Sequence, residues 1–256
     1  MNIQHNLTKI SQTNVIELPV TVSPAPWLML VSRMVLFFLF QALIAGILIL
    51  FGNPDGWHES PRWWSFVATL TNLASFGLLT WCMHKEGKKY FDLLRFSHGT
   101  WKKDVLWLIG LSVIGLPVAA APMNTLAAAI FGDPMVPIHM MFRPLPTWAL
   151  ALSFLFPLTI AFAELPTYFG YCMPRLAKQL NNPWAAWLLA SLALAAQHMF
   201  LPFIPDGRYL LWRMGMYLPF ALFAGLVLKF RPQLLPYFVV IHALMDISTV
   251  AVYWMI

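Results

Sequence analysis

Long apolar runs separated by short polar segments dominate the chain. Most of these runs reach the roughly 20 helical residues that cross a bilayer core about 30 Å thick. The pattern therefore predicts an all-α fold, a polytopic membrane helical bundle with about seven transmembrane helices. The predicted spans lie at residues 27–51, 63–83, 104–131, 148–172, 184–200, 210–229 and 234–255.

The first span follows a polar segment that is punctuated by proline. This segment lacks the short apolar core and small-residue cleavage site of a signal peptide, so we expect residues 1–26 to form a cytoplasmic N-terminal tail. Residues 27–256 are expected to fold as one transmembrane bundle. Pro117 and Pro122 lie inside the third span and predict a kink or a break in that helix.

The composition agrees with a membrane protein. Sixty per cent of the residues are hydrophobic and 10% are charged, whereas about 25% of the residues of a soluble domain are charged. We therefore expect an integral membrane protein whose partner is the lipid bilayer. The formal net charge of +6 would suggest a nucleic-acid partner in a soluble protein. Here we expect no nucleic acid, because the basic residues concentrate in loops on one side, above all in segment 84–103.

The distribution of Lys and Arg also predicts the orientation. Loops rich in these residues lie in the cytoplasm by the positive-inside rule, which places the N-terminus in the cytoplasm and the C-terminus outside. We interpret Arg33 and Arg213 as residues in the first turns of their spans, whose charged groups reach the membrane interface. Tyr168 and Arg175 are interpreted as an interfacial anchor and a positive-inside marker.

Ionisable side chains are rare inside the predicted spans, and they carry the strongest functional signal in the chain. A charged side chain at a helix centre costs at least about 2.5–3.5 kcal/mol on insertion scales, so such residues usually serve a function. Asp246 follows His242 by one helical turn and shares its helix face. We expect four residues to meet inside the membrane as the candidate catalytic set: Glu164, His198, His242 and Asp246.

These residues lie in three segments that resemble the motifs of a known family. The first segment reads ELPTYFGYCMPRL from Glu164, the second reads LAAQH and ends at His198, and the third reads HALMD from His242. Their order and spacing resemble those of the CPBP membrane proteases, which include the type II CAAX prenyl endopeptidases and the bacterial Abi or bacteriocin-processing proteins. The resemblance covers about residues 148–250.

The first segment departs from the family pattern at two positions. A second glutamate is usual where Leu165 stands, and an arginine is usual where Phe169 stands. The two differences remove an acid and a base together, and apolar replacement of a buried ion pair is often neutral or stabilising. We therefore expect this helix to fold normally. Leu194 replaces a phenylalanine of the second motif, which exchanges one apolar residue for another.

The resemblance implies an intramembrane endopeptidase that hydrolyses a peptide bond near the membrane, in a peptide or a lipidated protein, without a cofactor. Glu164, helped by His198, would activate the attacking water. His242 would donate a hydrogen bond to the developing oxyanion, and Asp246, which only accepts hydrogen bonds when ionised, would orient His242. Pro166 would interrupt the helix beside the site and admit substrate or water. The family also implies a bacterial plasma membrane.

Three alternatives remain open at this stage. In a zinc protease, the four ligands would be Glu164, His198, His242 and Asp246, although the chain has no HExxH motif. A catalytically inactive relative that acts as an immunity or scaffold protein is favoured by the apolar residues at positions 165 and 169. A proton-relay transporter also uses carboxylates and histidines near the middle of the membrane.

Overall fold

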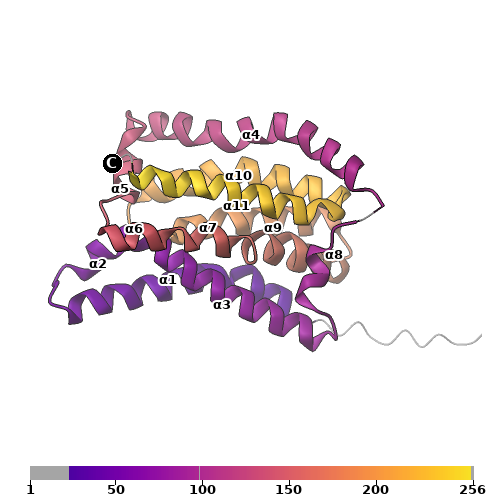
Figure 1. The fold of residues 1–256 in the computed structure, drawn as a ribbon, viewed down its shortest axis with the longest axis horizontal. Coiled ribbons are helices and arrows are strands. Elements are labelled where there is room, and N and C mark those ends of the chain that lie inside the picture. Colours follow the sequence, from indigo (N-terminus) through magenta and orange to yellow (C-terminus); the bar gives the residue numbers. More distant parts are fainter. Residues whose placement is uncertain (1–22, 98, 255–256) are drawn as a thin grey trace, which may run out of the picture.

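The computed structural model describes residues 23–97 and 99–254, and the regular structure within these ranges is entirely helical. Figure 1 shows the helices packed side by side with their long axes nearly parallel. This arrangement confirms the all-α membrane bundle, because five helical segments are long and apolar enough to cross a membrane. Most of the tail predicted for residues 1–26 lies outside the described residues.

The five long segments coincide with predicted spans. Large apolar side chains such as Leu39 and Leu106 are exposed on their outer faces, as expected where a helix meets lipid rather than water. These segments comprise α1 (Ala25–Leu50), α3 (Trp64–Lys85) preceded by α2 (Gly56–Glu59) and η1 (Ser60–Trp63), α4 (Trp101–Phe131), α10 (Gly207–Phe230), and α11 (Leu235–Ala251) preceded by η5 (Pro232–Leu234).

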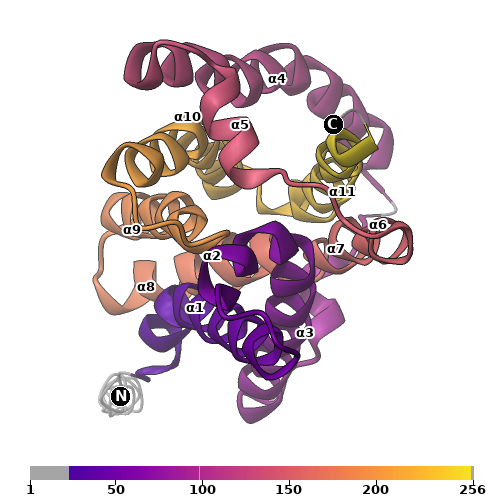
Figure 2. The ribbon, with the colours of Figure 1, turned by 90° about the vertical axis from the view of Figure 1, so that its left-hand side faces the viewer.

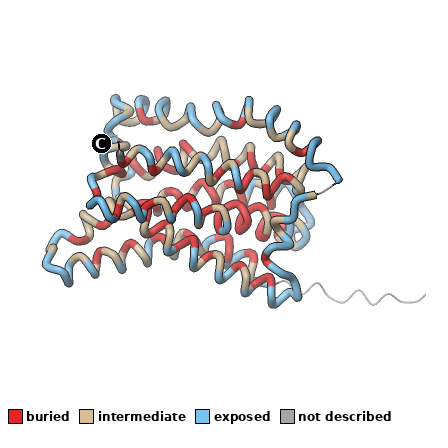
Figure 3. The backbone as a smooth tube through the Cα atoms, in the orientation of Figure 1, coloured by how far each residue is buried: buried red, intermediate tan, exposed pale blue. Residues whose placement is uncertain are grey.

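The two remaining predicted spans are not single long helices. The predicted span 148–172 is divided into α6 (Thr147–Ser153), α7 (Leu155–Ile160) and the π-helix η3 (Pro166–Cys172), and the chain then continues as α8 (Met173–Gln179). The predicted span 184–200 is α9 (Pro183–Gln197), followed by the single turn η4 (His198–Phe200). Figure 3 shows that buried residues concentrate in the middle of the bundle. The π-helix lies in this buried part, where protein neighbours can satisfy irregular backbone, whereas α6 and α7 keep exposed apolar faces, for example at Trp148 and Leu158. The connecting elements are η2 (Tyr90–Leu94), α5 (Met135–Met141) and η6 (Val252–Trp254).

The change from α- to π-helix occurs at Pro166. Proline has no N–H group, so it cannot donate the α-helical hydrogen bond to the carbonyl of Phe162. The hydroxyl of Tyr90 donates to that carbonyl instead, at 2.8 Å. The interruption expected from Pro166 is therefore present, and it lies directly beside Glu164.

Helices α9 and α10 pack against each other along an extensive interface. The N-terminus of α9 is capped by Asn182, whose side chain accepts hydrogen bonds from two backbone amides. Small buried residues such as Ala186 and Ala190 then let α10 approach closely. This packing fixes the C-terminal end of α9, where His198 follows.

Helix α4 packs mainly on α10 and lies at the edge of the bundle (Figures 1 and 2). It continues as one helix through Pro117 and Pro122, so the predicted break does not occur. Of its residues, only Asp104, Gly115 and Ala127 are buried.

Candidate functional site

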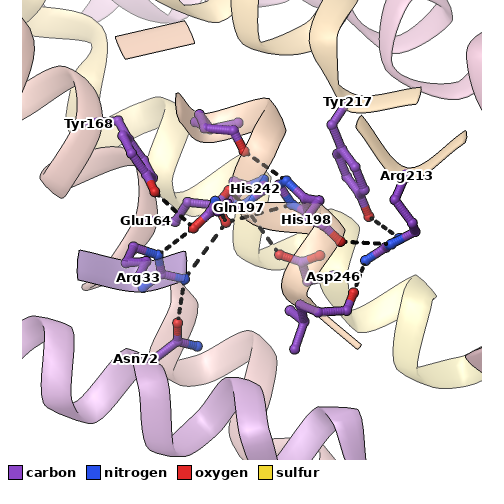
Figure 4. Close-up of polar contacts among 12 residues, drawn as sticks. Arg33, Asn72, Glu164, Tyr168, Gln197, His198, Arg213, Tyr217, His242 and Asp246 are labelled. Atoms are coloured by element: carbon purple, nitrogen blue, oxygen red, sulfur yellow. Dashed lines mark hydrogen bonds and ion pairs between the residues drawn. The ribbon is translucent and has the colours of Figure 1, made fainter. Parts of the chain in front are cut away.

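The structure brings together the four residues singled out in the sequence (Figure 4). Glu164, two residues before the π-helix begins at Pro166, is 1% exposed. Its Oε1 atom lies 2.9 Å from Nε2 of His242, and its Oε2 atom lies 3.8 Å from Nε2 of His198. The Oδ2 atom of Asp246 lies 3.5 Å from Nε2 of His242. Segments far apart in the sequence thus form one polar cluster inside an apolar bundle.

The ring of His198 is held in one orientation by its surroundings. Its Nδ1 atom lies 2.9 Å from the carbonyl oxygen of Leu194. A carbonyl oxygen only accepts, so Nδ1 carries the proton and, in the neutral ring, Nε2 has a free lone pair on the side of Glu164. Tyr217 stacks on the same ring. His198 can therefore accept a proton or a hydrogen bond at a fixed point next to the carboxylate.

Three buried polar atoms around His242 have no partner with hydrogen-bond geometry among the described residues: Oε1 of Glu164, Nε2 of His242 and Oδ2 of Asp246. The 2.9 Å approach of His242 to Glu164 is thus a close contact of charged or polar groups rather than an aligned hydrogen bond. Buried polar atoms are usually hydrogen-bonded, and exceptions often mark chemical sites. These three atoms can contact a polar group placed between them.

Arg33 of α1 also belongs to this cluster, and the expectation that it reaches the membrane interface is wrong. Its Nη2 atom lies 3.8 Å from Oε2 of Glu164 and donates a 2.9 Å hydrogen bond to Asn72. The side chain is completely buried. Because α1 begins at Ala25, Arg33 lies in its third turn, about 12 Å along the helix. That is too deep for a residue of the first turn.

Gln197 links Arg33 to Glu164. Its amide nitrogen donates a 2.6 Å hydrogen bond to Oε2 of Glu164, while its carbonyl oxygen accepts from Nε of Arg33 at 2.7 Å. The hydroxyl of Tyr168 donates to the same carbonyl at 3.2 Å. Tyr168 is fully buried, so its interpretation as an interfacial anchor is wrong as well. The sequence signal for this network was the uncharged Gln197 within an apolar span.

Arg213 of α10 is likewise buried and does not reach the interface. Its Nε atom donates to the carbonyl oxygen of His198 at 3.2 Å, and its Nη2 atom donates to the carbonyl oxygen of Leu201. The guanidinium thus satisfies the carbonyls freed where α9 ends in the single turn η4. This contact fixes the backbone that carries His198.

The two apolar substitutions in the first motif are packed inside the bundle. Leu165 and Phe169 are 1% and 4% exposed and belong to one apolar core with Leu194. Phe169 lies against Gly225 of α10, where a Cβ atom would come within 2.7 Å of its ring. Position 169 therefore serves the packing of the η3 segment against α10.

At the other end of this segment, Arg175 of α8 pairs with Glu86, which follows α3. Its Nε atom donates a 2.7 Å hydrogen bond to Oε1 of Glu86, and its guanidinium lies over the ring of Tyr171. The hydrogen bond from Arg175 holds the pKa of Glu86 below its usual value of 4.5. Besides marking a basic end of the bundle, Arg175 thus joins α8 to the end of α3.

The zinc alternative requires ligands spread around a common point. Among the described residues, no group of three or more His, Cys, Asp or Glu side chains has an arrangement suited to a metal ion. The zinc site formed by Glu164, His198, His242 and Asp246 stays a prediction, and metal analysis of the protein tests it.

Comparison of the chain with models of protein families, with curated proteins and with solved structures finds no match.

Proposed function

We propose that this protein is an intramembrane endopeptidase of the CAAX prenyl protease type, in which Glu164 activates water for attack on a peptide bond. The observation that carries this proposal is the meeting of one carboxylate with two imidazoles in a buried cluster, within 3.8 Å. The three sequence segments that supply these groups resemble the CPBP motifs in order and spacing.

Each group has a role that its geometry supports. Glu164 takes a proton from water while Nε2 of His198 accepts a hydrogen bond from the same water, and the hydroxide oxygen attacks the carbonyl carbon. An N–H donor at Nε2 of His242 stabilises the oxyanion that forms. When the C–N bond breaks, Glu164 returns its proton to the leaving amine. Atoms and charges balance over the cycle, and no cofactor takes part.

Asp246 is proposed to orient His242 through the 3.5 Å contact at Nε2. The contacts of His242 with both carboxylates fit a donor that can move to a substrate oxygen, because hydrogen bonds in a free active site commonly align only when the substrate is bound. The partnerless atoms Oε1 of Glu164 and Oδ2 of Asp246 support this view.

An apolar pocket supports entry of the substrate from the membrane. It lies between α4, α10 and α11 and is lined by His242, with apolar walls that include Leu108, Leu111, Phe220 and Phe238. Apolar walls suit the hydrophobic part of a membrane-bound peptide or of a lipidated protein. On this proposal, substrate reaches the site between α4 and α11.

The proposed orientation places the end of the bundle that holds Lys85, Arg175 and Arg231 in the cytoplasm. Ten basic residues of the described chain lie at that end, whereas Arg62, Arg143 and Arg208 lie at the other. The positive-inside rule then puts the N-terminus in the cytoplasm, and the family resemblance favours a bacterial plasma membrane.

The test is a cleavage assay with the purified protein in lipid nanodiscs. Internally quenched peptides, with and without a C-terminal isoprenoid, are the probes. We expect Glu164→Gln and His198→Ala to lose at least about 100-fold in turnover. Glu59→Gln and His84→Ala, which change residues outside the polar cluster, should keep the turnover of the wild type. Activity that survives Glu164→Gln would exclude the proposed base.

The same assay separates the alternatives. Loss of activity with a chelator, together with about one zinc per protein by metal analysis, would favour the zinc protease. If the wild-type protein cleaves no substrate under any condition but still binds a partner protein, the immunity or scaffold interpretation replaces the enzymatic one.

A further inference from the structure

A buried carboxylate in a membrane bundle requires a positive charge close by, because isolated ions are very costly in an apolar medium. The first motif of this chain does not supply that charge, because Phe169 stands where an arginine is usual. Phe169 packs against α10 instead. Arg213 is also buried, but its guanidinium is engaged by the carbonyls of His198 and Leu201. Besides the 2.9 Å contact with His242, the permanent positive charge beside Glu164 must therefore come from another part of the bundle.

Arg33 meets this requirement from α1. Among the described residues, no other Lys or Arg has its charged group within 4 Å of the Glu164 carboxylate. It lies on the buried face of α1 together with Met29, Phe37 and Gln41, at helical spacing. The dashed contacts in Figure 4 run from Arg33 to Asn72 on one side and toward Glu164 and Gln197 on the other.

Arg33 acts on Glu164 at two points. Its Nη2 atom faces Oε2 of the carboxylate at 3.8 Å, and its Nε atom holds Gln197, whose amide donates to the same oxygen at 2.6 Å. A planar guanidinium with several fixed donors can make both contacts, whereas the single ammonium of a lysine cannot reproduce them. Asn72 holds the guanidinium from the opposite side.

We propose that Arg33 is the positioning residue that orients Glu164 and compensates its charge, so that α1 supplies the basic partner of this carboxylate. The inference rests on the proposed peptidase function for its catalytic part. Arg33 does not touch the substrate. It acts through the carboxylate and through Gln197.

Two measurements on the full-length protein in nanodiscs test this role. The first is the kinetics of peptide cleavage for Arg33→Lys, Arg33→Gln and Arg33→Met. We expect Arg33→Met to lose about 100-fold in kcat with KM changed by less than about threefold, and Arg33→Lys to recover part of that loss, because it restores the charge but not the fork of donors. Arg208→Met is the matched control, since Arg208 is exposed on α10.

The second measurement is a double-mutant cycle on thermal stability with Glu164→Gln. Arg33→Met should lower the unfolding midpoint by about 10 °C in the wild-type background, because it removes the guanidinium partner of a buried carboxylate. In the Glu164→Gln background the same substitution should cost less than half as much. Arg33→Gln, which keeps an amide at this position, provides the cycle if Arg33→Met does not fold.

The two measurements test different parts of the proposal. If the wild-type protein cleaves no probe, the peptidase function is lost, but coupling in the stability cycle still supports Arg33 as the partner of Glu164. Equal stability costs in the two backgrounds overturn the pairing. A full kcat in a folded Arg33→Met protein, with an active wild type, overturns the positioning role.

Discussion

The ring of Tyr217 stacks on the ring of His198, with centroids 3.5 Å apart and an interplanar angle of 15°. The same imidazole is held by the Leu194 carbonyl, and its backbone carbonyl accepts a hydrogen bond from Arg213. Tyr217 and Arg213 both lie on α10, outside the three motif segments. Helix α10 therefore sets the orientation of a proposed catalytic residue to which it is not adjacent in sequence.

Replacing Tyr217 tests this stacking. Aromatic pairs contribute about 0.5–1.5 kcal/mol beyond the area they bury, so Tyr217→Leu should lower kcat by up to about tenfold as the imidazole loses its fixed plane. Tyr217→Phe keeps the ring and should stay within about twofold of the wild type. Turnover of the quenched peptides gives the comparison. Equal activity of the Leu and Phe variants would show that the stack does not position His198.

Gln197 should be essential for stability. Gln197→Met keeps the approximate volume but leaves Oε2 of Glu164 and Nε of Arg33 without their short hydrogen bonds. An unsatisfied buried group costs about 1–3 kcal/mol, and more when it is charged. The unfolding midpoint in nanodiscs should therefore fall by roughly 5–10 °C. Gln233→Met, at a partly exposed site, is the control and should leave the midpoint unchanged.

The pair of Arg175 and Glu86 should make stability depend on pH below about 4.5. The hydrogen bond from Arg175 lowers the pKa of Glu86 in the folded protein. The stabilisation is then complete above the unfolded value of 4.5 and is lost as the pH falls through the lower folded value. For a partly exposed ion pair this amounts to about 0.2–1 kcal/mol. Between pH 7 and pH 3, the unfolding midpoint of the wild-type protein should fall because this stabilisation is lost, and Glu86→Gln should lack this part of the fall. A pH profile of Glu86→Gln equal to that of the wild type would contradict the assignment.

Gly225 is a position where a single methyl group should destabilise the bundle. A Cβ atom there would lie 2.7 Å from the ring of Phe169 and 2.7 Å from Oγ of Ser191. Overpacking of this kind costs about 1–3 kcal/mol, so Gly225→Ala should lower the unfolding midpoint by several degrees. Gly77→Ala is the matched control, since a Cβ at Gly77 meets nothing within 4 Å and alanine favours the helix. A midpoint for Gly225→Ala at or above that of the control would refute the close packing.

The bundle and the polar cluster were accessible from sequence because both depend on strong local signals. Long apolar runs require helices in a membrane, and rare ionisable residues inside them stand out against that background. Glu164, His198 and His242 could therefore be singled out before their distances were known. Their roles in catalysis remain proposals.

The partners of these residues were missed because their contacts depend on three-dimensional packing. Arg33 and Arg213 were assigned to the interface from their positions in spans, yet both are buried. Each hydrogen-bonds to polar groups of a different helix. The hydrophobic periodicity of one helix does not predict which groups of another helix it will contact. The division of the span 148–172 was missed for a related reason, since the π-helix at Pro166–Cys172 packs among protein neighbours that bury most of its residues.

The position of α4 at the edge of the bundle has a consequence for how this scaffold can change. Leu108 and Leu111 line the same pocket as His242, yet their helix contributes few buried residues to the interior of the molecule. Substitutions along this helix can reshape one wall of the pocket while the polar cluster on the other side of it keeps its geometry. If the pocket binds substrate as proposed, α4 is the wall on which its selectivity can change with least effect on the helices that hold Glu164.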